Sequence, residues 1–336
     1  MKALRFLPCA LAVVLALTGC NKKSEPGTAN NSGGKQLLVA LLPKSKGNEY
    51  FVTVEKGARA AASELGVQLL FDGPTNTDAA KQNEIVENWI TQDVDVIAAA
   101  AENKAGLSSA LKKAEAKGIK VVTYDSDANT DARSFFVNQA TAQGIGEVLM
   151  DTAAKLCNEE GEFAIITATL TAGNMNEWRK FIEARLAEKY PKMKLIATNP
   201  CDDNKDKAQQ EATNLLGANP NLKCIMAICS PAVPGAAEAV KQAGKAGTVK
   251  VLGLGLPKEN RAYVKEGITQ AVILWKVEDL GYLTIQAAKA LADGKLKAGD
   301  KSFKAGRLGD VEVAGDNIVL GKPFVFTKDN IDQFDF

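Results

Sequence analysis

The chain has 336 residues and a formal net charge of +1, and 46% of its residues are hydrophobic and 24% charged. This length exceeds that of a typical single core and indicates two lobes, while the balanced charge gives no concentrated basic face for nucleic acid. The chain has no histidine, which excludes Ser-His and Cys-His catalytic pairs and removes the commonest metal ligand. The absence leaves carboxylate chemistry open but counts against an enzyme, and we expect no enzyme activity, no metal site and no cofactor.

The N-terminus has the pattern of an export signal. Lys2 and Arg5 precede an apolar run over residues 6–17, which ends at Gly19 and Cys20. The run is too short to span a bilayer permanently and has signal-peptide flanks. The small residues before Cys20 resemble the lipobox of bacterial lipoproteins. This resemblance implies a lipoprotein signal peptide over residues 1–20, lipidation of Cys20, and a lipid anchor in the cell envelope or periplasm. An ordinary signal peptide with an incidental cysteine is the alternative.

Residues 21–35 are polar and rich in Gly, Ser and Asn, which predicts a flexible tether, and the folded part should begin near Gln36. From there, short apolar runs alternate with helical patterns. The predicted strands cover 37–42, 67–71, 94–99, 120–124, 134–137, 163–167, 194–198, 224–229, 250–254 and 269–275. The predicted helices cover 49–65, 78–90, 107–117, 140–156, 176–189, 206–216 (stopped by Gly217), 235–242, 257–265 and 278–291.

This alternation predicts an α/β protein with two doubly wound parallel-sheet lobes, because strands that are apolar throughout are covered on both faces. The join falls near residues 137–140. The tail beyond Gly294 has short β-like segments at 310–313, 318–320 and 323–327, and we expect it to recross between the lobes. The predicted lobes are residues 36–137 plus 276–321 and residues 138–275 plus 322–336. Since ligands bind beyond the carboxyl ends of parallel strands, the two lobes should enclose a cleft with a hinge.

Candidate ligand contacts of the first lobe follow its strands. Lys44 can donate to a hydroxyl or carbonyl oxygen, or can be a solvated loop lysine. Tyr50 and Phe51 can cover the apolar face of a sugar ring, or can pack at a helix start. Asp125 can accept two hydroxyl hydrogens at once, and we assign it to ligand contact. We assign Asp127 to a turn or supporting role, which Asp often fills.

In the second lobe, Asn174 follows a strand and can both donate and accept hydrogen bonds. Trp178 is expected on the next helix, with its side chain in the core of the lobe. Backbone groups of the loop over 229–235 can bind ligand, since Pro231 and Pro234 restrict it. Trp275 ends the strand that should return to the first lobe.

Four cysteines remain beyond the N-terminal region, and their spacing has no CxxC metal pattern. A Cys157–Cys224 disulfide is one interpretation, because export permits disulfides and both residues precede predicted strands. Plain buried thiols at Cys157, Cys201, Cys224 and Cys229 are the other.

The folded part resembles the periplasmic sugar-binding proteins of the ribose-binding type, and most closely the autoinducer-2-binding and rhamnose-binding proteins. The similar segments are LLPKSKGN, LLFDGPTNT, ALKKAEAKGIKVVTYDSD, FFVNQ, PAVPGAAEAV, RAYVKEG and VFTKDNIDQFDF. The resemblance implies the type I periplasmic binding protein fold with a multi-strand hinge, a small sugar-like ligand, an ABC transporter permease as partner, and a monomer. It also implies ligand contacts from Lys44 and Asp125, and backbone contacts from Pro234 and Ala236.

Some positions depart from the autoinducer-2-binding pattern. Asn174 and Met175 stand where that group has an acidic residue and Gln, and Cys229 stands where an aspartate is expected. Tyr124 replaces a Trp, and Lys276 replaces an aspartate. Rhamnose or another deoxy sugar is therefore the ligand that we expect first, with autoinducer-2 as the other.

Import has three alternatives. A protein that presents a bound signal to a membrane receptor would have the same fold. A carboxylate-based glycosidase would need a pair of carboxylates such as Asp125 and Asp127 at a separation of about 5–9 Å. A two-lobed repressor would need a helix-turn-helix, and the sequence has none.

Overall fold

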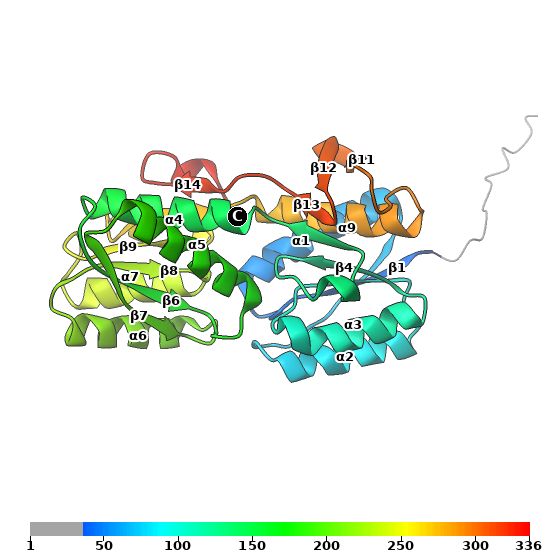
Figure 1. The fold of residues 1–336 in the computed structure, drawn as a ribbon, viewed down its shortest axis with the longest axis horizontal. Helices are drawn as coiled ribbons and strands as arrows, with labels where there is room; N and C mark the ends of the chain where they lie inside the picture. The colour runs from blue at the N-terminus through cyan, green and yellow to red at the C-terminus, as the bar shows by residue number, and fades with distance from the viewer. Residues whose placement is uncertain (1–35) are drawn as a thin grey trace, which may run out of the picture. The chain divides into compact units, whose positions relative to one another are not determined.

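The computed structural model describes residues 36–336, and two sheets organise this part of the chain (Figure 1). The predicted signal peptide, Cys20 and the tether lie outside the described residues. The first sheet has the order β11-β12-β13-β5-β4-β3-β1-β2 and the second has the order β14-β10-β9-β8-β6-β7. The predicted α/β class with two parallel-sheet lobes is confirmed.

The first lobe is built on β1 to β5, which all run parallel. Helices α1 and α9 pack together on one side of this sheet, and α2 and α3 pack together on the other (Figure 1). Its elements are β1 (Leu38–Leu42), α1 (Glu49–Leu65), β2 (Gln68–Phe71), α2 (Ala79–Thr91), β3 (Val96–Ala99), α3 (Lys104–Ala116), β4 (Lys120–Tyr124), η1 (Thr130–Ala132), β5 (Phe135–Asn138), α9 (Val277–Ala292), β11 (Ser302–Lys304), η2 (Gly306–Leu308), β12 (Asp310–Ala314) and β13 (Asn317–Val319).

The second lobe repeats this plan with β6 to β10 in parallel and β14 antiparallel to β10. Its elements are α4 (Ala142–Leu156), β6 (Gly161–Thr167), α5 (Gly173–Lys189), β7 (Met193–Pro200), α6 (Lys205–Ala218), β8 (Leu222–Ala227), α7 (Ala232–Gln242), β9 (Lys250–Leu254), α8 (Pro257–Lys265), β10 (Thr269–Leu274), β14 (Phe324–Phe326) and η3 (Ile331–Gln333).

Alternating side chains of the first sheet enter two separate apolar layers, because successive strand residues point to opposite faces. Leu42 and Ile97 pack with Trp89 of α2, whereas Leu41 and Val96 pack with Val54 of α1. Both faces of the sheet are therefore dry, which explains why its strands are apolar throughout.

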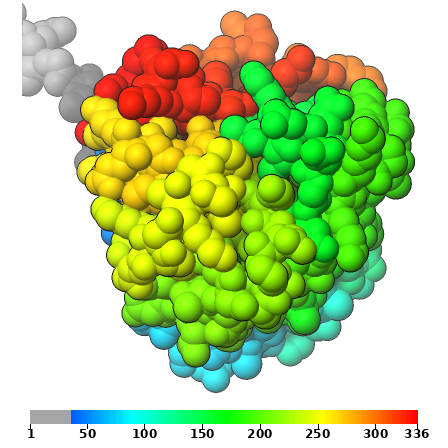
Figure 2. Space-filling model, turned by 90° about the vertical axis from the view of Figure 1, so that its left-hand side faces the viewer, coloured from blue at the N-terminus to red at the C-terminus, as the bar shows by residue number. Residues whose placement is uncertain are grey.

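The tail crosses between the lobes, as expected, since β13 pairs with β5 of the first sheet and β14 pairs with β10 of the second. The last residues then pack on α8, where the Arg261 guanidinium donates to the carbonyl of Phe334 at 2.5 Å. Figure 2 shows this C-terminal segment in red above the second lobe.

Two local expectations were wrong. The strand β11 was not anticipated, because only Phe303 among its three residues is apolar. Gly217 does not stop its helix: α6 continues to Ala218, where Asn219 caps it. Gly217 has open space around its Cα and needs no special backbone angle, so it acts only as a weak helix former.

The crossing of α1 and α9 requires glycine on both helices. A Cβ at Gly57 would lie 1.8 Å from the carbonyl oxygen of Glu278, and one at Gly281 would lie 1.9 Å from that of Val54. Neither contact can relax without moving a helix, because the neighbouring atoms are backbone.

We predict that Gly57→Ala lowers the free energy of unfolding by about 1–3 kcal/mol through overpacking. The matched control is Gly217→Ala, an exposed helical glycine with no neighbour to strike, which should raise it by about 0.5–1 kcal/mol. Urea unfolding followed by circular dichroism measures both. Equal effects of the two substitutions would contradict the close crossing.

Candidate ligand-binding site

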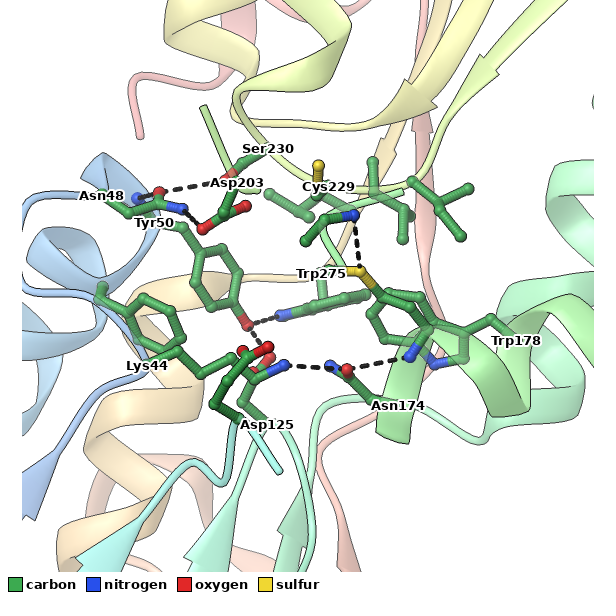
Figure 3. Close-up of a pocket in the computed structure, with 17 residues that line it drawn as sticks. Lys44, Asn48, Tyr50, Asp125, Asn174, Trp178, Asp203, Cys229, Ser230 and Trp275 are labelled. Atoms are coloured by element: carbon green, nitrogen blue, oxygen red, sulfur yellow. Dashed lines mark hydrogen bonds between the residues drawn. The ribbon is translucent and has the colours of Figure 1, made fainter. Parts of the chain in front are cut away.

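A cavity of about 40 Å³ lies where the carboxyl ends of the strands of both lobes meet (Figure 3). It has room for about three water molecules. The lining residues are Lys44, Asn48, Tyr50, Phe51, Glu102, Asp125, Ala168, Asn174, Met175, Trp178, Asp203, Ile228, Cys229, Ser230, Leu254, Leu274 and Trp275.

A chain of hydrogen bonds fixes Asp125, which follows β4 in a left-handed backbone conformation with φ 58°. The indole of Trp275 donates to the Tyr50 hydroxyl at 3.0 Å, and that hydroxyl donates to an Asp125 oxygen at 2.9 Å. All three side chains are buried. The carboxylate is thereby held by one oxygen, which leaves the other to accept from a ligand.

Aromatic rings wall the cavity beside this chain. Tyr50 packs edge-on against Phe51 and Trp275, with ring centroids 5.1 and 6.1 Å away. Trp178 of α5 lies 6.2 Å from Trp275, so it lines the cavity as well as packing in the core. Such rings present flat apolar faces of the kind that cover one side of a sugar ring.

Hydrogen bonds join the two lobes across the cavity (Figure 3). The Lys44 ammonium donates to the Asn174 carbonyl at 3.0 Å. The Asn48 amide donates to Asp203 at 2.6 Å, and the Ser230 hydroxyl donates to Asn48 at 3.1 Å. Loops that are far apart in sequence therefore close over the cavity from both sides.

Three carboxyl groups in the cavity share the nearby Lys44. Burial raises the pKa of Asp125, partly offset by Lys44 and by the Tyr50 hydroxyl. Burial likewise raises the pKa of Asp203, although Asn48, Lys44 and Cys229 partly offset this shift. Burial also raises the pKa of Glu102. Lys44 and the Thr169 hydroxyl, which donates to Glu102 at 2.8 Å, partly offset this shift. The site is rich in acceptors and poor in positive charge.

A family model for the periplasmic binding protein domain matches residues 39–296. The chain belongs to this family. Its two lobes are the type I periplasmic binding protein fold. A solute-binding protein from Clostridium phytofermentas with bound L-rhamnose is similar to this periplasmic binding protein at 31% identity and a TM-score of 0.85, covering 90% of this chain and 98% of the other.

Two further proteins are similar to this periplasmic binding protein. LsrB from Clostridium saccharobutylicum in complex with AI-2 has 26% identity and a TM-score of 0.85, with 89% of this chain and 100% of the other covered. The D-allose-binding periplasmic protein of Escherichia coli is 31% identical over 72% of this chain and 80% of its own length. These relatives are transport proteins and not enzymes, so the glycosidase hypothesis is rejected.

The structure brings most of the predicted site residues together. Seven of the nine line the cavity, namely Lys44, Tyr50, Phe51, Asp125, Asn174, Met175 and Trp275.

Pro234 and Ala236 do not line the cavity, although backbone contacts from them were expected. Helix α7 begins at Ala232, earlier than the predicted start at residue 235, so both positions lie within the helix. Pro234 has no N–H, and the N–H of Ala236 is used within the helix. Backbone contacts from these two positions to a ligand stay a prediction.

The polar side chains that sequence reasoning missed are those of Asn48, Glu102, Asp203 and Ser230. Asp203 follows β7 and lies beside Cys229, so it brings a carboxylate to the region where one was expected at residue 229. Asp202 and Asp203 both have left-handed backbones, with φ of 52° and 53°. The sequence held a signal for Glu102 and Asp203, since each follows the carboxyl end of a parallel strand.

Asp127 has the supporting role that was expected. It accepts from the Arg133 guanidinium at 2.8 and 3.0 Å, and from the Thr123 hydroxyl at 2.5 Å. Arg133 also pairs with Asp316 at 2.5 Å, which ties the β4–β5 loop to the crossing tail.

Within residues 36–336, no group of side chains is arranged to hold a metal ion, and no helix is long and apolar enough to cross a bilayer. Cys157, Cys201, Cys224 and Cys229 are free thiols in this structure.

Two of the three tryptophans line the cavity, and Trp89 lies in a separate apolar layer of the first lobe. We predict that a ligand entering the cavity changes the intrinsic fluorescence through Trp178 and Trp275. Trp89→Phe should keep this change, whereas the Trp178→Phe, Trp275→Phe double variant should lose it. A fluorescence change that persists in the double variant and is lost in Trp89→Phe would place the ligand elsewhere.

Proposed function

We propose that this chain is a substrate-binding lipoprotein of an ABC importer, and that it captures a small sugar-like molecule in the cavity between its lobes. One observation carries the proposal: acceptor and donor side chains from both lobes converge on a cavity walled by Trp178, Trp275, Tyr50 and Phe51. Carboxylates accept hydroxyl hydrogens, while the rings cover apolar ring faces. The family is periplasmic, and its relatives here are sugar-transport proteins.

We infer that the ligand is rhamnose or another deoxy sugar, and next an autoinducer-2-type molecule. Relatives at 31% and 26% identity are named with L-rhamnose and with AI-2. Met175, Ile228, Leu254 and Leu274 supply apolar lining, which suits a ligand that has a methyl group in place of a hydroxyl.

We further propose that the lobes comprise residues 36–137 plus 276–321 and residues 138–275 plus 322–336, and that the chain is a monomer. The hydrogen bond between Lys44 and Asn174 and the bond between Asn48 and Asp203 close the cavity. In this proposal the lobes part about the hinge to admit the sugar, and the closed form presents both lobes to the membrane permease.

The ligand is tested by a thermal-shift panel of deoxy sugars, parent sugars and autoinducer-2. A sugar at ~100 times its Kd adds about 2.7 kcal/mol of stability, and L-rhamnose is expected to give the largest shift. Asp125→Ala should weaken binding by about 10- to 100-fold, since it removes a charged hydrogen-bond acceptor. Asp131→Ala, an exposed carboxylate outside the cavity, is the control. Failure of every sugar to shift the Tm would contradict the proposed function.

Affinity should fall as the pH is lowered, and the fall should begin at a higher pH than exposed carboxyls would predict. The pKa values of Asp125, Asp203 and Glu102 are raised, so these groups take up protons and stop accepting from hydroxyls. The same shifts mean that the folded, unliganded chain binds protons more tightly than the unfolded chain. Its stability from these groups therefore increases as the pH falls. Isothermal titration calorimetry at several pH values would contradict this if the affinity stayed constant.

The lipid anchor is tested by fractionation of cells that produce the full chain. Cys20→Ser should leave the chain without lipid and move it from the membrane fraction to the soluble fraction. Cys9→Ser, within the predicted signal peptide, is the matched control and should stay in the membrane fraction. A wild-type chain found in the soluble fraction would contradict the lipoprotein assignment.

A further inference from the structure

Two cysteines meet beneath the cavity in the second lobe. Cys201 and Cys229 are both buried, and their sulfur atoms lie 3.5 Å apart. Cys201 follows β7 and Cys229 follows β8, and these strands flank β6 in the sheet. The N–H of Cys201 donates to Thr167 and that of Ile228 donates to Ile166, so both loops are pinned to the end of β6.

The same two loops carry the second lobe's contacts with Asn48. Asp203 lies two residues after Cys201 and accepts from the Asn48 amide. Ser230 lies next to Cys229 and donates to Asn48. Cys229 itself lines the cavity. A covalent link between the two sulfur atoms would therefore fix both of these loops relative to each other.

We propose that Cys201 and Cys229 form a disulfide in the exported protein, which crosslinks the two ligand-cavity loops. The periplasm is an oxidising compartment in which disulfides persist. Moving the sulfur atoms from contact to a bond of about 2.0 Å needs only about 1.5 Å of closure.

The oxidant is the disulfide of a thiol–disulfide oxidoreductase of the cell envelope. The Cys201 thiolate attacks one sulfur of that disulfide, which forms a mixed disulfide and releases the other sulfur as a thiolate. The Cys229 thiolate then attacks the Cys201 sulfur, forms the Cys201–Cys229 bond and releases the second thiolate. The two protons of the cysteines pass to the two released thiolates, and the oxidoreductase gains two electrons.

The local environment sets the order of these steps. A hydrogen bond with Cys229 lowers the pKa of the Cys201 thiol although burial opposes the shift, and burial raises the pKa of Cys229. Cys201 is thus the better thiolate. Because both sulfur atoms are buried in the closed structure, the exchange takes place as the loops fold or while the lobes are apart.

The test is peptide mapping of the full-length chain, exported in a bacterial host and purified in mild detergent without reductant. Free thiols are alkylated before digestion. The expected result is a peptide pair joined through Cys201 and Cys229 and lighter by two hydrogen atoms than the separate peptides. Alkylation of both cysteines, even after incubation with oxidised glutathione, would overturn the proposal. This readout needs no ligand, so it is independent of the proposed sugar.

Variants separate this link from the second thiol pair, in which half-buried Cys157 lies beside Cys224. Cys157→Ser should retain the Cys201–Cys229 link, and reductant should lower its Tm by several degrees, as in the wild type. Cys229→Ser and Cys201→Ser should lack the link, and reductant should leave their Tm unchanged in a Cys157→Ser background. The proposal would be overturned if reductant lowered the Tm only of the variants that retain Cys157.

Discussion

Parallel strands that end at one edge of their sheet are the constraint on which this site depends. Each strand of a parallel sheet delivers the residue after its carboxyl end to the same edge. In the first lobe that edge receives Lys44, Glu102 and Asp125, and in the second it receives Asp203, Cys229 and Trp275. Because residues from both edges line one cavity, residues more than 200 positions apart can share one hydrogen-bond chain, as Tyr50 and Trp275 do.

The site is built at a cost in stability that ligand binding can offset. Burying carboxylates without enough opposing charge is unfavourable, and the raised pKa values of Glu102, Asp125 and Asp203 report that cost. The surrounding core is dry and closely packed, down to the glycine contacts between α1 and α9. A rigid frame of this kind can hold strained elements such as the left-handed backbones of Asp125 and Asp203.

Much of this architecture could be predicted from the sequence, because strands buried on both faces are apolar throughout and are followed by clear turn or loop signals. The same reasoning found Lys44 and Asp125, since each directly follows such a strand. It missed Asp203 because the loop after β7 contains two adjacent aspartates and an asparagine, any of which is an ordinary turn residue. Pro234 and Ala236 came from the family resemblance and not from a strand end, and backbone contacts from them stay a prediction. The cross-lobe partners of Asn48 depend on lobe closure, which no local pattern contains.

The central claim is that the two lobes close on a sugar held by side chains of both. Small-angle X-ray scattering of the mature chain, with and without saturating L-rhamnose, tests it most directly. The account predicts a smaller radius of gyration with the sugar, because closure brings Asn48 to Asp203 and Lys44 to Asn174. An unchanged radius at a sugar concentration shown to saturate binding would contradict it.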